Sequence, residues 1–485
     1  MDRLNGFSLI DAGAVARVAG EFGTPVYLYD ESHILSRCRE CLNMPSAYGL
    51  TVRFAMKANS NRTLLKTISG AGLHIDASSL NEAIRAHLAG IPLENIMLTT
   101  QEVHEGAARV KLEEFLLHGL KYNVCSLRQL RMIGEFASAF DLNLGIRIHP
   151  GFGSGESATR NTGDEYSCFG VHLSDVEEAI AYANELSIKF HHVHEHIGSG
   201  GDSEKWRQNI DIELGIVEKH FPDAESVGFG GGLKDARMPD EVPADVRSLG
   251  AYAKKRVEEF YERTGRKLKT EIEPGTYITA NSGYAVTRIL DKKSTARMNF
   301  IIIDGSMEIN ARPLFYGSRH PIYIVSEDGE TVKSSEFPSL GGMPPTHQAP
   351  SPVEGGASEP FPSLGGVPPQ VAGWLPQSAA ANGGEPYSHD GETPPSYTAV
   401  VAGRCCESGD CQTLDAEGNP VPRAMTEPEA GDLAVIGGVG AYCSTMTPFN
   451  YNSHTQIPEV LFTTDGCLEL IRRRQTIEQM LENEI

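Results

Sequence analysis

The chain has 485 residues, of which 40% are hydrophobic and 22% charged, so it is long enough for two or three domains whose core needs no disulfide support. Its formal net charge of −22 argues against nucleic acid or an anionic membrane surface as a partner. No apolar stretch approaches the roughly 20 residues that are needed to cross a bilayer.

The first 22 residues have the pattern of a short amphipathic helix rather than of a secretory signal. The nine cysteines are scattered along the chain. Cys406 and Cys411 come nearest to the spacing of zinc ligands, but no second cysteine or histidine pair is suitably spaced, so we expect no metal site. These features favour a cytoplasmic protein.

Between residues 27 and 280, short apolar runs alternate with helical patterns. This alternation predicts a parallel sheet, and about eight such units is the number in a closed (β/α)8 barrel. A doubly wound open sheet is the alternative. The strand-like runs are VYLYD, LTVRFAM, GLHIDA, NIMLT, YNVCS, LNLGIRI, KFHHVHEHIG, SVGFGGG and LKTEIEP.

Beyond residue 280 the pattern changes to strands and turns, which predicts a C-terminal β-rich domain made of residues 281–335 and 395–485. We expect residues 1–26 to pack with this domain and the closing LELIRRRQTIEQMLENEI to form a helix. Residues 336–394 repeat FPSLGGMPP as FPSLGGVPP within a stretch rich in Pro, Gly and Ser. This composition predicts a disordered insertion, with a tether for a partner as the alternative.

Lys57 ends the apolar run TVRFAMK. A lysine at the end of a barrel strand points into the mouth where such barrels hold their active sites. Partial burial lowers the pKa of a lysine amine and makes it a nucleophile, although a lysine at a strand end is more often a solvated charge.

Three glycine-rich segments follow strand-like runs: HIGSG from His196, FGGG from Phe229 and EPG from Glu273. Backbone N–H groups in such loops bind phosphate, although glycine at such a corner is commonly a simple turn residue. At successive strand ends of one barrel, the three segments together predict a phosphate-binding cup.

The ordered motifs AMKANSN, HEHIGSG, GFGGG, EIEPG, ARPLFYG, CCESGD, GAYCSTM and NYNS resemble those of the fold-type III pyridoxal-phosphate-dependent decarboxylases. Among these, the chain is most similar to the bacterial diaminopimelate decarboxylases. The resemblance implies a barrel of the alanine-racemase type, a C-terminal β-rich domain and a homodimer with shared active sites. It also implies decarboxylation of meso-2,6-diaminopimelate to L-lysine.

The resemblance implies a role for each matching residue. Lys57 would hold the cofactor covalently, His196 would stack on its ring, and Glu273 would bond the ring nitrogen. Cys406 would come from the partner subunit as a proton donor. The phosphate would be bound by Ser199, Gly231, Gly232, Gly275 and Tyr442, and the substrate by Arg312, Tyr316, Glu407 and Tyr442.

Four motifs depart from the family pattern, and in two of them an arginine is replaced: by Thr276 in EPGT and by His454 in NSH. Cys168 replaces a lysine, and DGS replaces DAG around Asp304. Loss of positive charge weakens the binding of a carboxylate, so another amino acid or an amino-acid conjugate remains possible as substrate. A catalytically silent regulatory homologue and a racemase on the same barrel are further alternatives. Arg319 and His320 could compensate for the lost charge.

Two other sites stay open. Asp76 and Ser78 resemble residues that line the cofactor pocket, but a structural role is equally compatible with the sequence. Asp304 is expected to anchor a turn.

Overall fold

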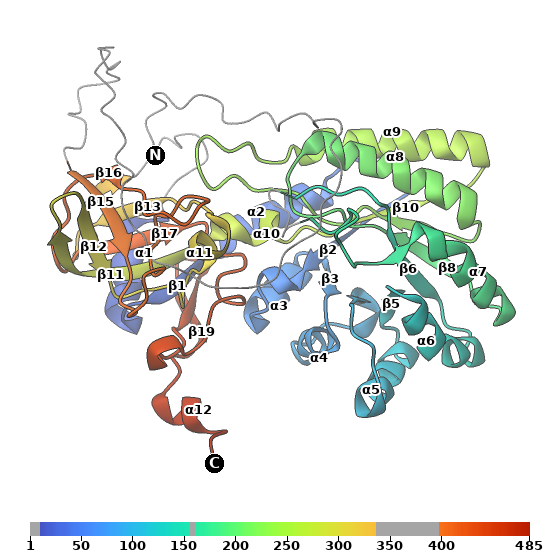
Figure 1. Cartoon of the computed structure of the whole chain (residues 1–485), viewed down its shortest axis with the longest axis horizontal. Helices are drawn as coiled ribbons and strands as arrows, with labels where there is room; N and C mark the ends of the chain where they lie inside the picture. The colour runs from blue at the N-terminus through green and yellow to red at the C-terminus, as the bar shows by residue number, and fades with distance from the viewer. Residues whose placement is uncertain (1–9, 156–160, 336–396) are drawn as a thin grey trace, which may run out of the picture. The chain divides into compact units, whose positions relative to one another are not determined.

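The computed structural model describes residues 10–155, 161–335 and 397–485. Eight parallel strands in these ranges close into a barrel, because β5 pairs with β6 and β10 pairs with β2 (Figure 1). The two-residue β7 (Val171–His172) adds to the outer edge of β6. The barrel strands are β2 (Leu50–Ala55), β3 (His74–Ala77), β4 (Ile96–Thr99), β5 (Lys121–Val124), β6 (Leu144–His149), β8 (Phe190–His194), β9 (Ser226–Gly228) and β10 (Lys269–Ile272).

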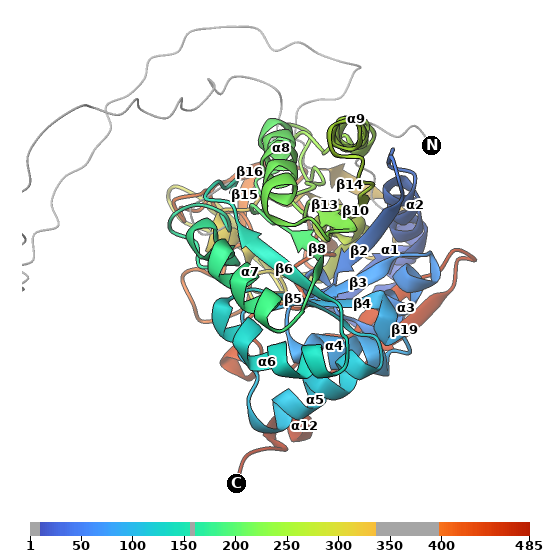
Figure 2. The same ribbon diagram turned by 90° about the vertical axis from the view of Figure 1, so that its right-hand side faces the viewer.

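Helices surround this barrel, as the view in Figure 2 shows. Strands such as β4 and β6 are buried along their whole length, since side chains fill the interior and helices cover the outside. Ser79, Ser126 and Asp245 cap helices by accepting hydrogen bonds from the backbone of the first turn. The helices are α2 (Glu31–Leu42), α3 (Arg62–Gly70), α4 (Leu80–Leu88), α5 (Gly106–Leu117), α6 (Leu127–Ala139), α7 (Val176–Glu185), α8 (Ser203–His220), α9 (Val246–Thr264) and the short α10 (Thr276–Thr279).

The β-rich part forms a second, ten-stranded sheet. Its strands are β1 (Val26–Asp30), β11 (Gly283–Ser294), β12 (Asn299–Ile303), β13 (Ile322–Val325), β14 (Val332–Ser335), β15 (Tyr397–Ala402), β16 (Arg423–Met425), β17 (Leu433–Gly437), β18 (Glu459–Phe462) and β19 (Leu468–Arg472). The helix α1 (Ala12–Phe22) packs Val15 and Val18 against strand residues of this sheet, among them Val286 and Val435.

Two expectations about element placement are wrong. The run VYLYD is not a barrel strand: β1 pairs with β11 and β18, so the barrel strands begin at Leu50 and not near residue 27. The tail is not one helix, because its first residues form β19 against β18 and only α12 (Ile477–Leu481) is helical. The predicted insertion at 336–394 lies outside the described residues.

The β domain meets the barrel at the carboxyl end of β2. The Tyr442 N–H donates to the Ala58 carbonyl at 2.8 Å, and the Asn59 amide donates to the Gly440 carbonyl at 3.1 Å. A side chain at position 440 would meet the Thr279 carbonyl oxygen, so glycine is required for this close approach. These contacts bring the loop after β17 to the mouth of the barrel.

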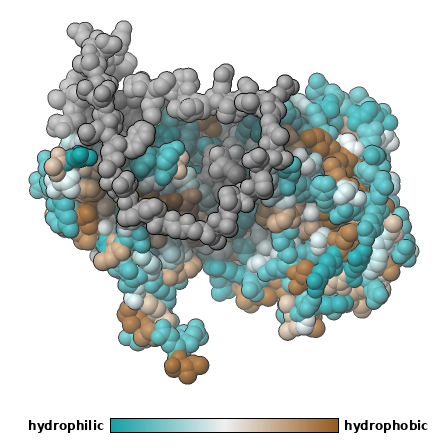
Figure 3. Space-filling model, in the orientation of Figure 1, coloured by the Kyte–Doolittle hydropathy of each residue, from teal (hydrophilic) through white to brown (hydrophobic). Residues whose placement is uncertain are grey.

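The visible outer surface of the barrel helices is largely hydrophilic, with hydrophobic side chains interspersed (Figure 3). Within the described residues, no helix combines the length and the apolar character needed to cross a membrane.

Candidate active site

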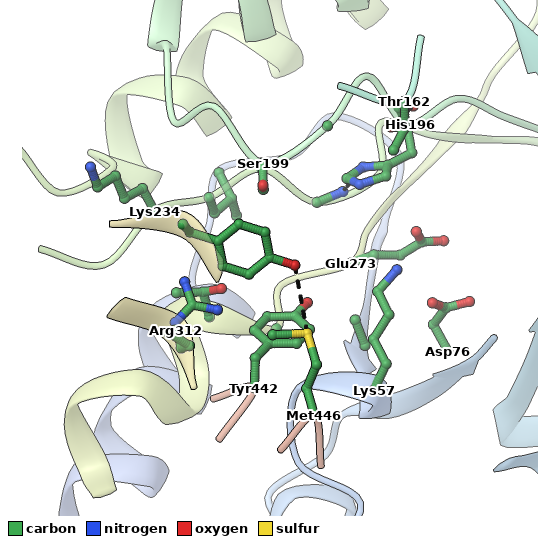
Figure 4. Close-up of a pocket in the computed structure, with 18 of the residues that line it drawn as sticks. Lys57, Asp76, Thr162, His196, Ser199, Lys234, Glu273, Arg312, Tyr442 and Met446 are labelled. Atoms are coloured by element: carbon green, nitrogen blue, oxygen red, sulfur yellow. Dashed lines mark hydrogen bonds between the residues drawn. The ribbon is translucent and has the colours of Figure 1, made fainter. Parts of the chain in front are cut away.

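A cavity of about 350 Å³ lies at the carboxyl ends of the barrel strands, with walls from both the barrel and the β domain (Figure 4). Its position agrees with the place where such barrels hold their active sites. Ten residues predicted from the sequence line it: Lys57, His196, Ser199, Gly231, Gly232, Glu273, Gly275, Arg312, Tyr316 and Tyr442.

Lys57 lies in the 3₁₀ turn (Met56–Ala58) that follows β2, and its amine projects into the cavity near Asp76 and Glu273. Burial alone would lower the pKa of this amine, but the Tyr442 phenol and the two carboxylates outweigh it and raise the pKa above its ordinary value. The expectation that burial lowers this pKa is therefore wrong for the protein without a bound ligand.

Glu273 follows β10 and is held by a hydrogen bond, with its Oε2 2.9 Å from Nε2 of His194 at the end of β8. Burial lowers the pKa of His194 to about 3, so the imidazole is neutral and donates its N–H to the carboxylate. Burial raises the pKa of Glu273, although the positive charges of Lys57 and Arg147 oppose that shift. The carboxylate is thus oriented by a neutral donor.

Asp76 lines the same wall, at the end of β3. Burial, together with the negative charge of Glu273, raises the pKa of Asp76 to about 7, whereas Lys57 lowers it. Ser78 does not line the cavity, and its N–H donates to Oε2 of Glu82 at 2.7 Å. Asp76 therefore lines the site, whereas Ser78 does not and lies directly before Ser79, the N-terminal cap of α4.

The glycine-rich loop after β9 leaves no room for side chains. A Cβ at Gly231 would lie 2.7 Å from the Glu273 carbonyl oxygen, and a Cβ at Gly232 would lie 2.8 Å from the Gly198 carbonyl oxygen. Gly232 also has a positive φ of 83°, which favours glycine. Both positions keep backbone at the cavity wall.

His196 contacts this loop directly, since its Nδ1 accepts the Gly231 N–H at 3.1 Å. Burial lowers the pKa of His196 well below its ordinary value, which leaves the ring neutral. The Gly231 N–H is consequently already bonded, so this glycine contributes space to the cavity rather than a free donor. Ser199, on the same loop after β8, is exposed and lies on the same side of the cavity as His196 (Figure 4).

The β domain supplies an aromatic and cationic wall. The Arg312 guanidinium lies 5.5 Å from the ring centre of Tyr316 and 5.7 Å from that of Tyr442. The Tyr316 hydroxyl lies 3.7 Å from the sulfur of Met446. Tyr442 has a φ of 60°, a left-handed conformation that a tyrosine rarely adopts and that is typical of functional sites.

Cys406 and Glu407 do not line the cavity of their own chain. Both are exposed on the loop after β15. The Cys406 N–H donates to Oδ1 of Asn452 at 2.9 Å, and the Tyr451 hydroxyl donates to Oε2 of Glu407 at 3.0 Å. The loop is therefore ordered by its own neighbours, and both residues are exposed outside the cavity lining.

The positions that depart from the family pattern do not all lie in the site. Thr276 lines the cavity, but Cys168 and His454 do not. Arg319 forms an ion pair with Asp240 at 2.7 Å. His320 is fully buried, with Nδ1 2.9 Å from the Gly437 carbonyl oxygen, so neither of these two residues lines the cavity.

Asp304 anchors the chain as expected: it accepts hydrogen bonds from the Thr24 hydroxyl and the Arg288 N–H.

Several cavity residues were not identified from the sequence. His194 could have been, because it lies two residues before His196 in a predicted strand and so shares its face. Lys234 and Arg237 follow the glycine-rich loop in an irregular segment, where no periodic pattern indicates which side chains point inward. The other unpredicted lining residues are Ala55, Thr162, Gly198, Leu233 and Met446.

The comparisons with known proteins agree with this geometry. Residues 32–280 match the family model described as "Pyridoxal-dependent decarboxylase, pyridoxal binding domain". The diaminopimelate decarboxylase of Escherichia coli K12 is 29% identical over 98% of this chain and 97% of its own length. That of Streptomyces coelicolor is 28% identical over 98% of this chain and 92% of its own length.

Solved structures agree as well. A crystal structure of diaminopimelate decarboxylase superimposes with a TM-score of 0.78 at 29% identity, covering 97% of this chain and 96% of the other. The family model spans just over half of the chain. This protein therefore belongs to the pyridoxal-dependent decarboxylases.

Proposed function

We propose that the protein decarboxylates meso-2,6-diaminopimelate to L-lysine in lysine biosynthesis. The observation that carries this proposal is the division of the cavity: Lys57 and Glu273 lie on the barrel wall, and Arg312 lies on the facing wall from the β domain. An amino acid whose second carboxylate reaches a guanidinium suits this arrangement. The names of the similar full-length proteins point to the same substrate.

The cavity residues fit pyridoxal phosphate. A buried carboxylate held by a neutral donor, a lysine that reaches the cavity and a glycine-lined cradle that any Cβ would fill are the parts that this cofactor needs. When bound, the cofactor withdraws the electrons that the departing carboxylate leaves behind. Ser199, Gly232, Gly275 and Tyr442 would hold its phosphate, with Gly231 leaving the necessary space.

The remaining residues then have defined tasks. Lys57 would hold the cofactor covalently through its amine. Glu273 would keep the ring nitrogen of the cofactor protonated, and His194 holds the carboxylate in place for that bond. His196 would pack against the ring, and the Gly231 N–H fixes the tautomer of its imidazole.

The active site is shared between two copies of the chain. Cys406 and Glu407 are exposed and do not line the cavity of their own chain, which supports their placement in the cavity of a partner. There Cys406 donates the proton that replaces the lost carboxylate, and Glu407 binds the distal amine. Three exposed apolar residues at the C-terminus, Ile477, Leu481 and Ile485, are consistent with a surface that a second copy covers.

The protein works in the cytoplasm. All nine cysteines are free thiols, and all nine lie in the described residues. Free thiols in this number are typical of a reducing compartment.

A panel of amino acids tests the substrate. Purified holoprotein should release carbon dioxide from meso-diaminopimelate at least about tenfold faster, in kcat/KM, than from lysine, ornithine or arginine, because one lost charged contact costs about a factor of ten or more. A preference for one of the others would overturn the proposal. Such a preference would favour the alternative of another amino acid, which Thr276 motivates.

A further inference from the structure

The segment from Leu233 to Asp245 has no regular secondary structure, and its first residues line the cavity. Ion pairs hold it at several points. Asp235 pairs with Arg37 of α2 at 3.1 Å, and Asp240 pairs with Arg319 of the β domain at 2.7 Å. Between these two anchors, the Arg237 side chain reaches the cavity.

Arg237 is fixed in place by the β domain. Its Nε donates to the Gly438 carbonyl at 2.9 Å, and a Cβ at Gly438 would lie 3.0 Å from the Arg237 side chain. The residue is only 7% exposed. A buried guanidinium fixed through one nitrogen presents its remaining N–H groups in a defined direction.

Within the described residues, no carboxylate forms an ion pair with the Arg237 guanidinium. Glu241 accepts the backbone N–H of Arg237 itself, and Asp235 is already paired with Arg37. Among the described residues, NH2 of Arg237 and Nε of Arg312 are buried without any hydrogen-bond partner. Among the described residues, Arg312 also has no carboxylate within ion-pair distance. Burial lowers the pKa of Arg237 to about 10, and the nearby positive charge of Arg312 adds to this shift.

Two buried guanidinium groups that line one cavity without a carboxylate partner among the described residues are costly unless an anion binds them. Their planar sets of N–H donors suit a carboxylate. We propose that Arg237 is a specificity-determining residue which, together with Arg312, binds the distal carboxylate of the substrate. This inference rests on the proposed function, because it assigns one end of that substrate.

The position of Arg237 favours the substrate's carboxylate over the phosphate of the cofactor. Arg312 is the charged residue that acts most strongly on Arg237. Figure 4 shows Arg312 across the cavity from Lys57 and Glu273, which places Arg237 with the end of the cavity away from these two residues. Thr276 also lines the cavity, and it is uncharged where the family motif has an arginine. Arg237 therefore supplies a positive charge in place of that arginine.

Binding of two simple ligands isolates the carboxylate. L-lysine retains the distal carboxylate of diaminopimelate, whereas cadaverine has the same carbon chain and both amines but no carboxylate. In Arg237→Gln holoprotein, calorimetric affinity for L-lysine should fall about ten- to hundredfold, and affinity for cadaverine should change less than about threefold. Arg237→Lys should lie between, since it keeps the charge and loses the bidentate geometry. Arg85→Gln, an exposed arginine on α4, is the matched control and should match the unmodified protein.

Three results would overturn the inference: unchanged affinity for L-lysine, equal losses for L-lysine and cadaverine, or a loss confined to affinity for pyridoxal phosphate. The last would assign Arg237 to the phosphate. The substrate panel separates this inference from the proposed function. If the protein prefers another amino acid over diaminopimelate, the proposed function fails. The inference then stands only where that substrate has a distal carboxylate and its KM rises in Arg237→Gln.

Discussion

Nε2 of His194 lies 2.9 Å from Oε2 of Glu273, so a neutral imidazole at the end of one barrel strand holds a buried carboxylate at the end of another. The direction of this hydrogen bond follows from burial, which keeps His194 uncharged. The bond orients the Glu273 side chain at the cavity, although burial raises the pKa of its carboxyl group. The carboxylate can therefore pair with a protonated ring nitrogen, which is the electrostatic requirement for decarboxylation by this class of enzyme.

Glu273→Gln tests this relationship. An amide cannot hold a ring nitrogen in its protonated form, so kcat should fall about 10²–10³-fold, the usual loss when a group that stabilises developing charge is removed. Stopped-flow or steady-state assays would measure it. Glu177→Gln, an exposed residue of α7, is the control. Equal activity of the two variants would remove Glu273 from the mechanism.

Lys57→Ala should abolish both activity and the visible absorbance of the bound cofactor. The absorbance depends on a covalent link between cofactor and lysine, and Lys57 is the lysine whose amine projects beside Glu273. Lys66→Ala, an exposed lysine of α3, should keep both properties. Visible absorbance that persists in Lys57→Ala would assign the anchor to another residue.

Mixing two inactive variants tests the shared site. Cys406→Ala and Lys57→Ala should each fail alone. After subunit exchange they should recover up to about a quarter of the activity, because half of the dimers are mixed and each mixed dimer has one intact site of two. Exchange is confirmed by native mass spectrometry. A mixture that exchanges subunits and stays inactive would contradict a site built from two copies.

A buried acidic pair makes stability depend on pH. Glu195 and Glu213 are fully buried between the barrel and α8, and their four carboxylate oxygens have no hydrogen-bond partner among the described residues. Burial raises the pKa of both, and for Glu213 the charge of Glu195 adds to it. The folded protein thus holds a proton that the unfolded chain releases above pH about 4.3. Stability is accordingly lost as pH rises from that value through the raised pKa.

Glu213→Gln removes this dependence. The variant should gain about 1–3 kcal/mol over the unmodified protein at pH 8, the cost of an unsatisfied buried polar group, and should gain little at pH 5. Denaturant unfolding at both pH values measures the difference, with the exposed Glu185→Gln as control. A gain that is equal at both pH values would mean that the pair does not titrate in this range.

The sequence was sufficient to predict most of the barrel. Eight of its nine apolar runs are barrel strands, since alternation of strand and helix is a local pattern. The ninth, VYLYD, has the same local pattern but pairs with strands that lie far along the chain, such as β18. The strands that pair with VYLYD are set by the tertiary structure, and a local sequence pattern does not indicate them.

The candidate site divides in the same way. Lys57, His196 and Glu273 lie at strand ends, where a barrel brings residues together whatever the intervening sequence. Arg237 lies in an irregular segment, and its direction depends on contacts with Gly438 and on ion pairs such as that of Asp240 with Arg319. No signal in the sequence near Arg237 shows these contacts. The sequence predicted a loss of positive charge around the substrate, and only the structure shows that Arg237 supplies positive charge in this cavity.

The central claim is that this cavity converts diaminopimelate to lysine. The most direct test is to incubate purified holoprotein with meso-diaminopimelate and to quantify L-lysine and carbon dioxide together. The account predicts one L-lysine for each carbon dioxide released, and neither product from Lys57→Ala. A protein that shows the visible absorbance of bound cofactor but forms no lysine would contradict it.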